Sequence, residues 1–137
     1  MHRLKRIIGL LLFVSLASGC STKEDPPPST ISLLTSGVWT INKVTIDGID
    51  QTSMFSSMTL VFTTNTYTTT KGGLVWPANG TFQLNDNDEI IRNDAAVISI
   101  DELSETQLGL SLTWSKNALG SGRINSISGK HTFLFKR

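Results

Sequence analysis

Histidine and cysteine, which often perform catalysis or hold metals, are scarce in this 137-residue chain, although serine is abundant. Cys20 is the only cysteine, and His131 is the only histidine apart from His2 near the start. Nucleophilic and metal chemistry would need companions for these groups, such as a second histidine or a cysteine pair. The sequence also lacks a nucleophile-elbow motif. We therefore expect a non-enzyme with no catalytic residue, no metal and no cofactor, and a packed, hydrogen-bonded His131.

An acidic run at residues 85–89 is the one segment whose composition suggests calcium. An EF-hand loop that began at Asp86 would need an oxygen ligand at its fifth position and glycine at its sixth. Ile90 and Ile91 occupy those positions. Asparagine and aspartate also tolerate the backbone angles of tight turns. We therefore interpret the run as a hairpin turn.

The charge of the chain argues against a nucleic-acid partner. Without Arg3, Lys5 and Arg6, which belong to the predicted leader, nine basic residues face eleven acidic ones, a formal charge of −2. A nucleic-acid-binding domain normally carries a basic stripe, which is absent from this composition.

Residues 1–19 have the pattern of a cleaved leader. Basic residues precede an apolar run at 7–17, which is too short to span a bilayer, and Ser18 and Gly19 lead directly to Cys20. This pattern resembles a bacterial lipoprotein signal. The resemblance implies that Cys20 is lipidated, becomes the first residue and anchors the protein to a membrane. An ordinary secretory signal with an incidental thiol is the alternative.

Residues 20–32 are predicted to be a tether. Lys23, Glu24 and Asp25 precede three prolines, which favour extended backbone, and the segment has little apolar surface to bury. The charged triplet resembles the surface-export signal of Bacteroidetes lipoproteins, which implies the outer face of the outer membrane. If the triplet is only a hydrophilic spacer, the protein faces the periplasm.

Residues 33–137 are predicted to form one all-β domain. Apolar side chains recur with a period of two, and threonine, valine, isoleucine and aromatic residues dominate. The predicted strands are 38–46, 58–63, 66–70, 80–85, 89–92, 96–101, 108–114 and 127 to the end. Eight short strands joined by turns predict an antiparallel up-and-down β-barrel, with a two-sheet sandwich as the alternative. A phase change at residues 42–43 predicts a bulge, and the only helix expected is a short one at 52–57.

The predicted connections differ in length between the two ends of the barrel. Alternate connections of a meander share one end, so the long loops at 47–57, 71–79 and 115–126 should lie together. The opposite end receives tight polar turns and the start of the first strand. We call these ends the mouth end and the closed end. Small barrels hold ligands in such a mouth, and the tether at the closed end should turn it away from the membrane.

Several apolar side chains belong to the predicted mouth end. They are Met54, Phe55, Leu74, Trp76 and Trp114. Exposed apolar clusters tend to mark binding surfaces. These side chains are therefore candidate ligand-binding residues, but they are equally compatible with a plug that folds over the barrel and fills it.

Short motifs give the domain a resemblance to the lipocalin-like lipoproteins of Bacteroidetes, within the calycin group. The motifs are Gly37-Val38-Trp39 at the first strand, the threonine-rich run at 59–70, Gly80-Thr81-Phe82 and Leu108-Gly109-Leu110. The resemblance implies that Trp39 is buried at the closed end. It also implies that Arg137 lies over the Trp39 ring, as a basic residue near the last strand does in lipocalins. A frayed C-terminus is the alternative for Arg137.

Two functions follow from this fold and this resemblance. The first is a membrane-anchored binding module for a small apolar or amphipathic ligand held near the mouth. The alternative is a protein–protein interaction module, such as an inhibitor or an accessory subunit of a cell-surface complex. A lined cavity would favour the first function, and a barrel filled by side chains would favour the second.

Overall fold

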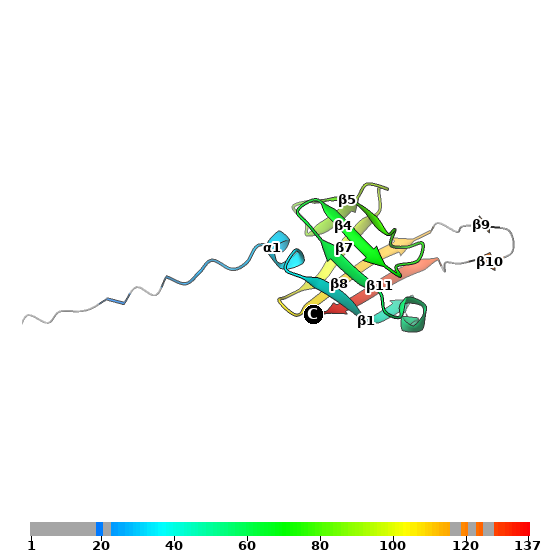
Figure 1. The fold of residues 1–137 in the computed structure, drawn as a ribbon, viewed down its shortest axis with the longest axis horizontal. Coiled ribbons are helices and arrows are strands. Elements are labelled where there is room, and N and C mark those ends of the chain that lie inside the picture. Colours follow the sequence, from blue (N-terminus) through cyan, green and yellow to red (C-terminus); the bar gives the residue numbers. More distant parts are fainter. Residues whose placement is uncertain (1–18, 21–22, 116–118, 121–122, 125–127) are drawn as a thin grey trace, which may run out of the picture.

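Eight antiparallel strands close into a barrel in the computed structural model of the chain (Figure 1). The structure describes residues 19–20, 23–115, 119–120, 123–124 and 128–137. The barrel strands are β1 (Val38–Ile46), β3 (Thr59–Phe62), β4 (Thr66–Thr70), β5 (Asn79–Leu84), β6 (Glu89–Arg92), β7 (Val97–Leu103), β8 (Gln107–Trp114) and β11 (Gly129–Lys136). Each barrel strand pairs with its neighbours in chain order, and β11 pairs with β1. The predicted up-and-down barrel is therefore confirmed, and the sandwich is excluded.

Closure depends on the pairing of the first and last strands. Val44 of β1 lies opposite Phe133 of β11, and the register shifts between Ile41 and Lys43. This shift is the predicted bulge. A bulge increases the local twist and bends its strand, which helps β1 to contact both β3 and β11 around the barrel.

The barrel interior is filled by the inward-facing residues of every strand. In β8, the inward-facing Leu108, Leu110, Leu112 and Trp114 are buried. On the other face Thr113 is exposed, and Gly109 and Ser111 are covered. The same alternation buries Leu60 and its partners on the neighbouring strands. Burial of each large apolar side chain contributes about 1.5–3 kcal/mol, so these rows supply most of the stability of the domain.

Five shorter elements accompany the barrel. They are α1 (Thr30–Leu34), β2 (Ile49–Asp50), the 3-10 helix η1 (Thr52–Phe55), β9 (Leu119–Gly120) and β10 (Arg123–Ile124). β2 extends the sheet beside β1, and β9 pairs with β10. The helix expected at 52–57 is present as η1, one turn of 3-10 geometry.

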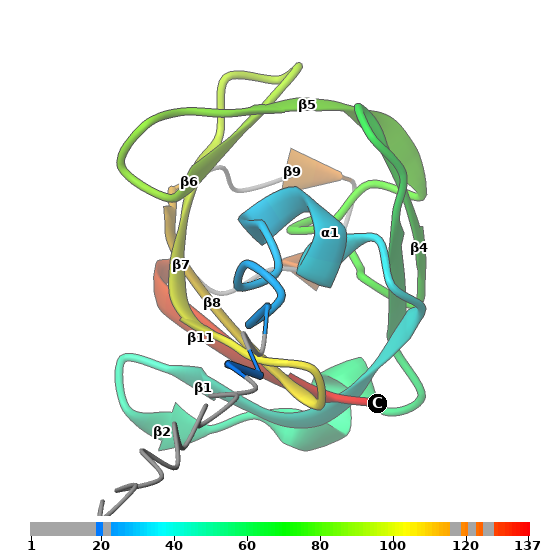
Figure 2. The same cartoon turned by 90° about the vertical axis from the view of Figure 1, so that its left-hand side faces the viewer.

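The helix α1 corrects the expectation that no other helix would form. Ser29 caps its start, because the Ser29 side chain accepts a hydrogen bond from the Ser32 backbone N–H. Its last residue, Leu34, is fully buried. Figure 2 shows α1 lying across the end of the barrel that faces the tether. The tether residues 23–29 have no regular structure, and the helix crosses the predicted boundary between tether and domain.

Two predicted segments fall largely outside the described residues. The leader at residues 1–18 is one, and most of the mouth-end loop at 115–126 is the other. Within the described part of the chain, no helix is long and apolar enough to cross a membrane.

Candidate functional site

The loop between β4 and β5 turns inward at the mouth end. Val75 and Trp76 are buried, and Trp76 is only 1% exposed although it lies outside the strands. Lys71 and Gly73 have positive φ angles of 53° and 63°, which reverse the chain at this point. Gly72 lies so close to Trp76 that a Cβ added at Gly72 would be 2.5 Å from the Trp76 Cβ. The loop is therefore folded tightly around its tryptophan.

Aromatic edges hold the Trp76 ring inside the barrel. Its ring centroid lies 5.6 Å from that of Tyr67 and 6.3 Å from that of Phe133, both in T-shaped arrangements. Phe55 of η1 packs against Phe133 in the same way, with the ring centroids 5.2 Å apart. Of the two interpretations of the mouth-end residues, the structure gives Phe55 and Trp76 the packed positions of a plug.

Arg92 is a buried residue that the sequence interpretation missed. Its side chain is completely buried, its Nη1 donates to the Val75 carbonyl at 2.6 Å, and its guanidinium lies 5.0 Å from the Trp76 ring centroid. Its Nε and Nη2 donate to the Asp94 carboxylate at 3.1 and 2.7 Å. The loop between β4 and β5, residues 71–78, is called the plug loop below. The guanidinium thus connects the plug loop to the β6–β7 turn. The sequence did contain a sign of this burial. Arg92 is two residues from Ile90 in the same strand, so the two side chains point to the same side of the sheet.

Several polar side-chain atoms inside the barrel are buried without a hydrogen-bond partner in the described structure. They are the Tyr67 hydroxyl, Thr69 Oγ1, Trp76 Nε1 and His131 Nε2. Burial raises the pKa of the Tyr67 hydroxyl, against the opposing effect of the Arg92 charge. Buried polar atoms are usually paired, so each of these atoms is an exception.

His131 lies fully buried at the mouth half of β11. Its Nδ1 is 3.0 Å from the Gly129 carbonyl oxygen, so Nδ1 carries the proton and donates it. The imidazole stacks on Phe133 with the ring centroids 6.1 Å apart. This geometry is that of a packed histidine, with Nε2 left as an acceptor.

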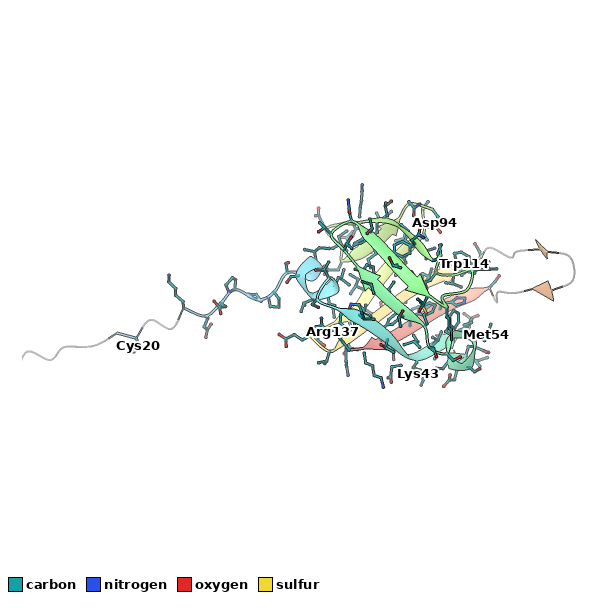
Figure 3. All side chains as sticks on the ribbon, in the orientation of Figure 1. Cys20, Lys43, Met54, Asp94, Trp114 and Arg137 are labelled. Carbon is teal, nitrogen blue, oxygen red and sulfur yellow. The ribbon has the colours of Figure 1, made fainter. Side chains whose placement is uncertain are left out.

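The remaining candidate residues are divided between the surface and the core. Met54 is 47% exposed and Leu74 is 41% exposed, whereas Trp114 is 7% exposed. Figure 3 shows Met54, Trp114 and Asp94 at the end of the barrel opposite Arg137 and Cys20. Met54 and Leu74 are therefore apolar side chains presented to solvent at the mouth end.

An open hollow of about 610 Å³ lies over the outer face of β7, β8 and β11 at the mouth end, and Trp114 lines it whereas Met54 and Leu74 do not. Its walls include the β6–β7 turn at 94–96, Val97 of β7, Ser111 and Trp114 of β8, and Lys130 of β11. Hydroxyl, apolar and charged groups thus meet in one place. Such a lining suits recognition of a molecule that has both polar and apolar parts.

The closed end is sealed by a second tryptophan. Trp39 is completely buried, and its Nε1 donates to the Leu34 carbonyl of α1 at 2.9 Å. The Arg137 guanidinium lies 4.7 Å from the Trp39 ring centroid. Arg137 also donates to the Glu105 carbonyl and to the Ser36 hydroxyl. The two structural residues of the sequence analysis are thus in contact.

The acidic run at 85–89 forms the β5–β6 turn. Asn85 Oδ1 accepts hydrogen bonds from the Asn87 and Glu89 backbone N–H groups, both at 3.0 Å. Its side-chain amide donates to Glu89 at 2.6 Å. The run is therefore organised by hydrogen bonds of its own, in agreement with the hairpin interpretation.

Cys20 is exposed and carries a free thiol in the described part of the tether. Comparisons with known proteins add no relative: no family model, curated protein or solved structure matches the chain.

Proposed function

We propose that the protein is a tethered binding module of the lipocalin-like type that recognises a protein partner with the mouth end of its barrel. One observation carries this proposal. Phe55 and Trp76 fill the interior, while Met54 and Leu74 from the same two loops project into solvent. Exposed apolar side chains on a well-packed support are typical of interaction surfaces. An inhibitor or an accessory subunit of a cell-surface complex would use such a surface.

A small amphipathic ligand is the second candidate, and the open hollow at the mouth end favours it. Its volume of about 610 Å³ falls within the usual range of ligand pockets, about 300–1,000 Å³. In this function the ligand would lie against Val97 and Trp114 with its polar group toward Lys130. We propose no catalytic role, because His131 is packed among aromatic rings and hydrogen-bonded to the backbone.

We further propose that Cys20 is lipidated and holds the protein on the outer membrane, facing outward. Its exposure and its position on the tether support this assignment. The variant Cys20→Ala should lose detergent-phase partitioning and acyl mass, while its unfolding midpoint stays unchanged because Cys20 contacts no part of the barrel core. Unaltered partitioning and mass would refute the anchor.

The partner is best sought by photocrosslinking in the host of the protein. A photoreactive amino acid is placed at Met54 or Leu74, with Thr68, an exposed residue on the outer face of β4, as the matched control. We expect one defined protein adduct from positions 54 and 74 that is absent from position 68. Equal adducts from all three positions, or none, would contradict a protein partner. Native mass spectrometry that retains a small ligand would instead support the second candidate.

A further inference from the structure

The Trp76 indole is closely packed, but its N–H lacks a hydrogen-bond partner in the described structure. The indole ring has aromatic edges on two sides, from Tyr67 and Phe133, and a guanidinium 5.0 Å from its centroid. Yet its Nε1 has no partner in the described structure, and neither does Thr69 Oγ1. An unpartnered buried polar group is energetically unfavourable. The indole is therefore well packed by its neighbours but leaves polar atoms without hydrogen bonds.

Three other buried polar groups of the barrel interior indicate what would fit better. His131 Nε2 is an acceptor without a donor, because Nδ1 carries the proton. The Tyr67 and Thr69 hydroxyls are donors without acceptors in the described structure. A hydroxyl group both donates and accepts, so one such substituent could satisfy either kind of partner. The charge of Arg92 is balanced by Asp94, which favours a neutral ring over an anion.

The residue that occupies this space is attached to a loop and not to the barrel. The plug loop is held by the hydrogen bond from Arg92 to the Val75 carbonyl and by the bond from the Trp76 N–H to the Gly72 carbonyl. The nearest β4–β5 pairs, at Thr66, Tyr67 and Thr68, lie outside the loop. Displacement of Trp76 would thus leave these strand pairs intact.

From these observations we infer that the space held by the Trp76 indole is a binding site for a planar, neutral, hydroxylated aromatic molecule. Trp76 occupies this site as an internal substitute. The ring of the ligand would take the cation–π contact with Arg92 and the edge contacts with Tyr67 and Phe133. Its hydroxyl would bond to the atoms that the indole leaves unpartnered. The inference rests on Trp76 and its neighbours inside the barrel, although Leu74 of the proposed partner surface belongs to the same loop.

The variant Trp76→Ala tests the inference directly, with indole and the four hydroxyindoles substituted at C4 to C7 as probes. We expect the probes to raise the unfolding midpoint of the variant and to bind in calorimetry. At least one hydroxyindole should bind about two- to tenfold more tightly than indole, the range that one net hydrogen bond provides. The added change His131→Phe or Thr69→Val should remove that advantage and leave indole binding intact.

Trp39→Ala is the matched control, because it removes a buried indole whose Nε1 has a partner. We expect no preference for hydroxyindoles in this variant. A preference of equal size there, or no binding of any probe to Trp76→Ala, would overturn the inference. If Trp76→Ala folds poorly, hydrogen exchange in the unaltered protein decides the question.

Hydrogen exchange tests the site in the unaltered protein. A saturating hydroxyindole should speed exchange of the Trp76 amide, whose bond to the Gly72 carbonyl breaks when the loop moves. Strand amides such as that of Leu110 should exchange more slowly, because binding stabilises the barrel. No change at either amide at millimolar probe would overturn the inference.

Discussion

Each end of the barrel holds a buried tryptophan near an arginine, but the two pairs are built differently. Trp39 belongs to β1 and donates its indole N–H to the helix of the tether, and its arginine is exposed. Trp76 belongs to a loop and lacks such a bond in the described structure, and its arginine is buried. The closed end is sealed by elements fixed through hydrogen bonds. At the mouth end the backbone of the loop is hydrogen-bonded, but the indole itself is held only by packing in the described structure.

Backbone conformation reinforces this contrast. Of the five described non-glycine residues with positive φ, four lie in mouth-end connections: Asp47, Ser57, Lys71 and Ala95. Only Asp88 lies at the closed end. Such conformations are unfavourable for residues with a Cβ and are often found at functional sites. The mouth end thus has more of this strained backbone than the closed end, where the β5–β6 turn contributes only Asp88 among the described residues.

The largest expected effect separates the two tryptophans. Trp39→Ala should lower the free energy of unfolding by about 4–5 kcal/mol, because it opens a cavity and orphans the Leu34 carbonyl. Trp76→Ala should lower it by about 3 kcal/mol, because no indole hydrogen bond is lost and the loop can relax. Urea unfolding measures both. Equal losses would show that the two ends are equally fixed, and a loss below about 1 kcal/mol for Trp39 would deny it a core role.

For the arginines we expect the opposite order: replacement at the mouth end should lower the free energy of unfolding more than replacement at the closed end. Arg92→Met removes a buried guanidinium from Asp94, which is itself 28% exposed at its side chain, so we expect a loss of about 2–3 kcal/mol. Arg137→Met removes an exposed cation–π contact, with a loss of about 1 kcal/mol or less. Methionine keeps the apolar stem in both variants. Similar losses in urea unfolding would contradict the difference in burial between the two pairs.

The sequence was sufficient to predict the barrel because strands impose a period of two. All eight barrel strands were predicted to within about two residues, and the bulge of β1 was visible as a change of parity. The helix α1 was not predictable in this way. Its five residues become helical because Ser29 caps them and because Leu34 has the closed end of the barrel to cover. That surface exists only after the barrel has formed.

The candidate site was less predictable for two reasons. Arg92 was missed because a charged strand residue is usually exposed. Its spacing of two residues from Ile90 nevertheless placed it on the inward face of β6. Met54 and Phe55 are adjacent and apolar, and only the 3-10 turn of η1 decides which of them enters the barrel. Loop residues have no fixed periodicity, so the sequence could identify the apolar group but could not sort it into plug and surface.

The division of the mouth-end residues into buried and exposed ones gives the smallest predicted change in stability. It is also the sharpest test of the mouth end. The double variant Met54→Ser/Leu74→Ser should change the free energy of unfolding by no more than about 0.5 kcal/mol, because both side chains are largely exposed. The matched variant Phe55→Ser/Trp76→Ser should lose several kcal/mol, as other core truncations do. Both comparisons use urea unfolding under identical conditions. If the first pair destabilised the protein as much as the second, Met54 and Leu74 would be packing residues. The mouth end would then present no spare apolar surface, and the proposed partner site would lose its basis.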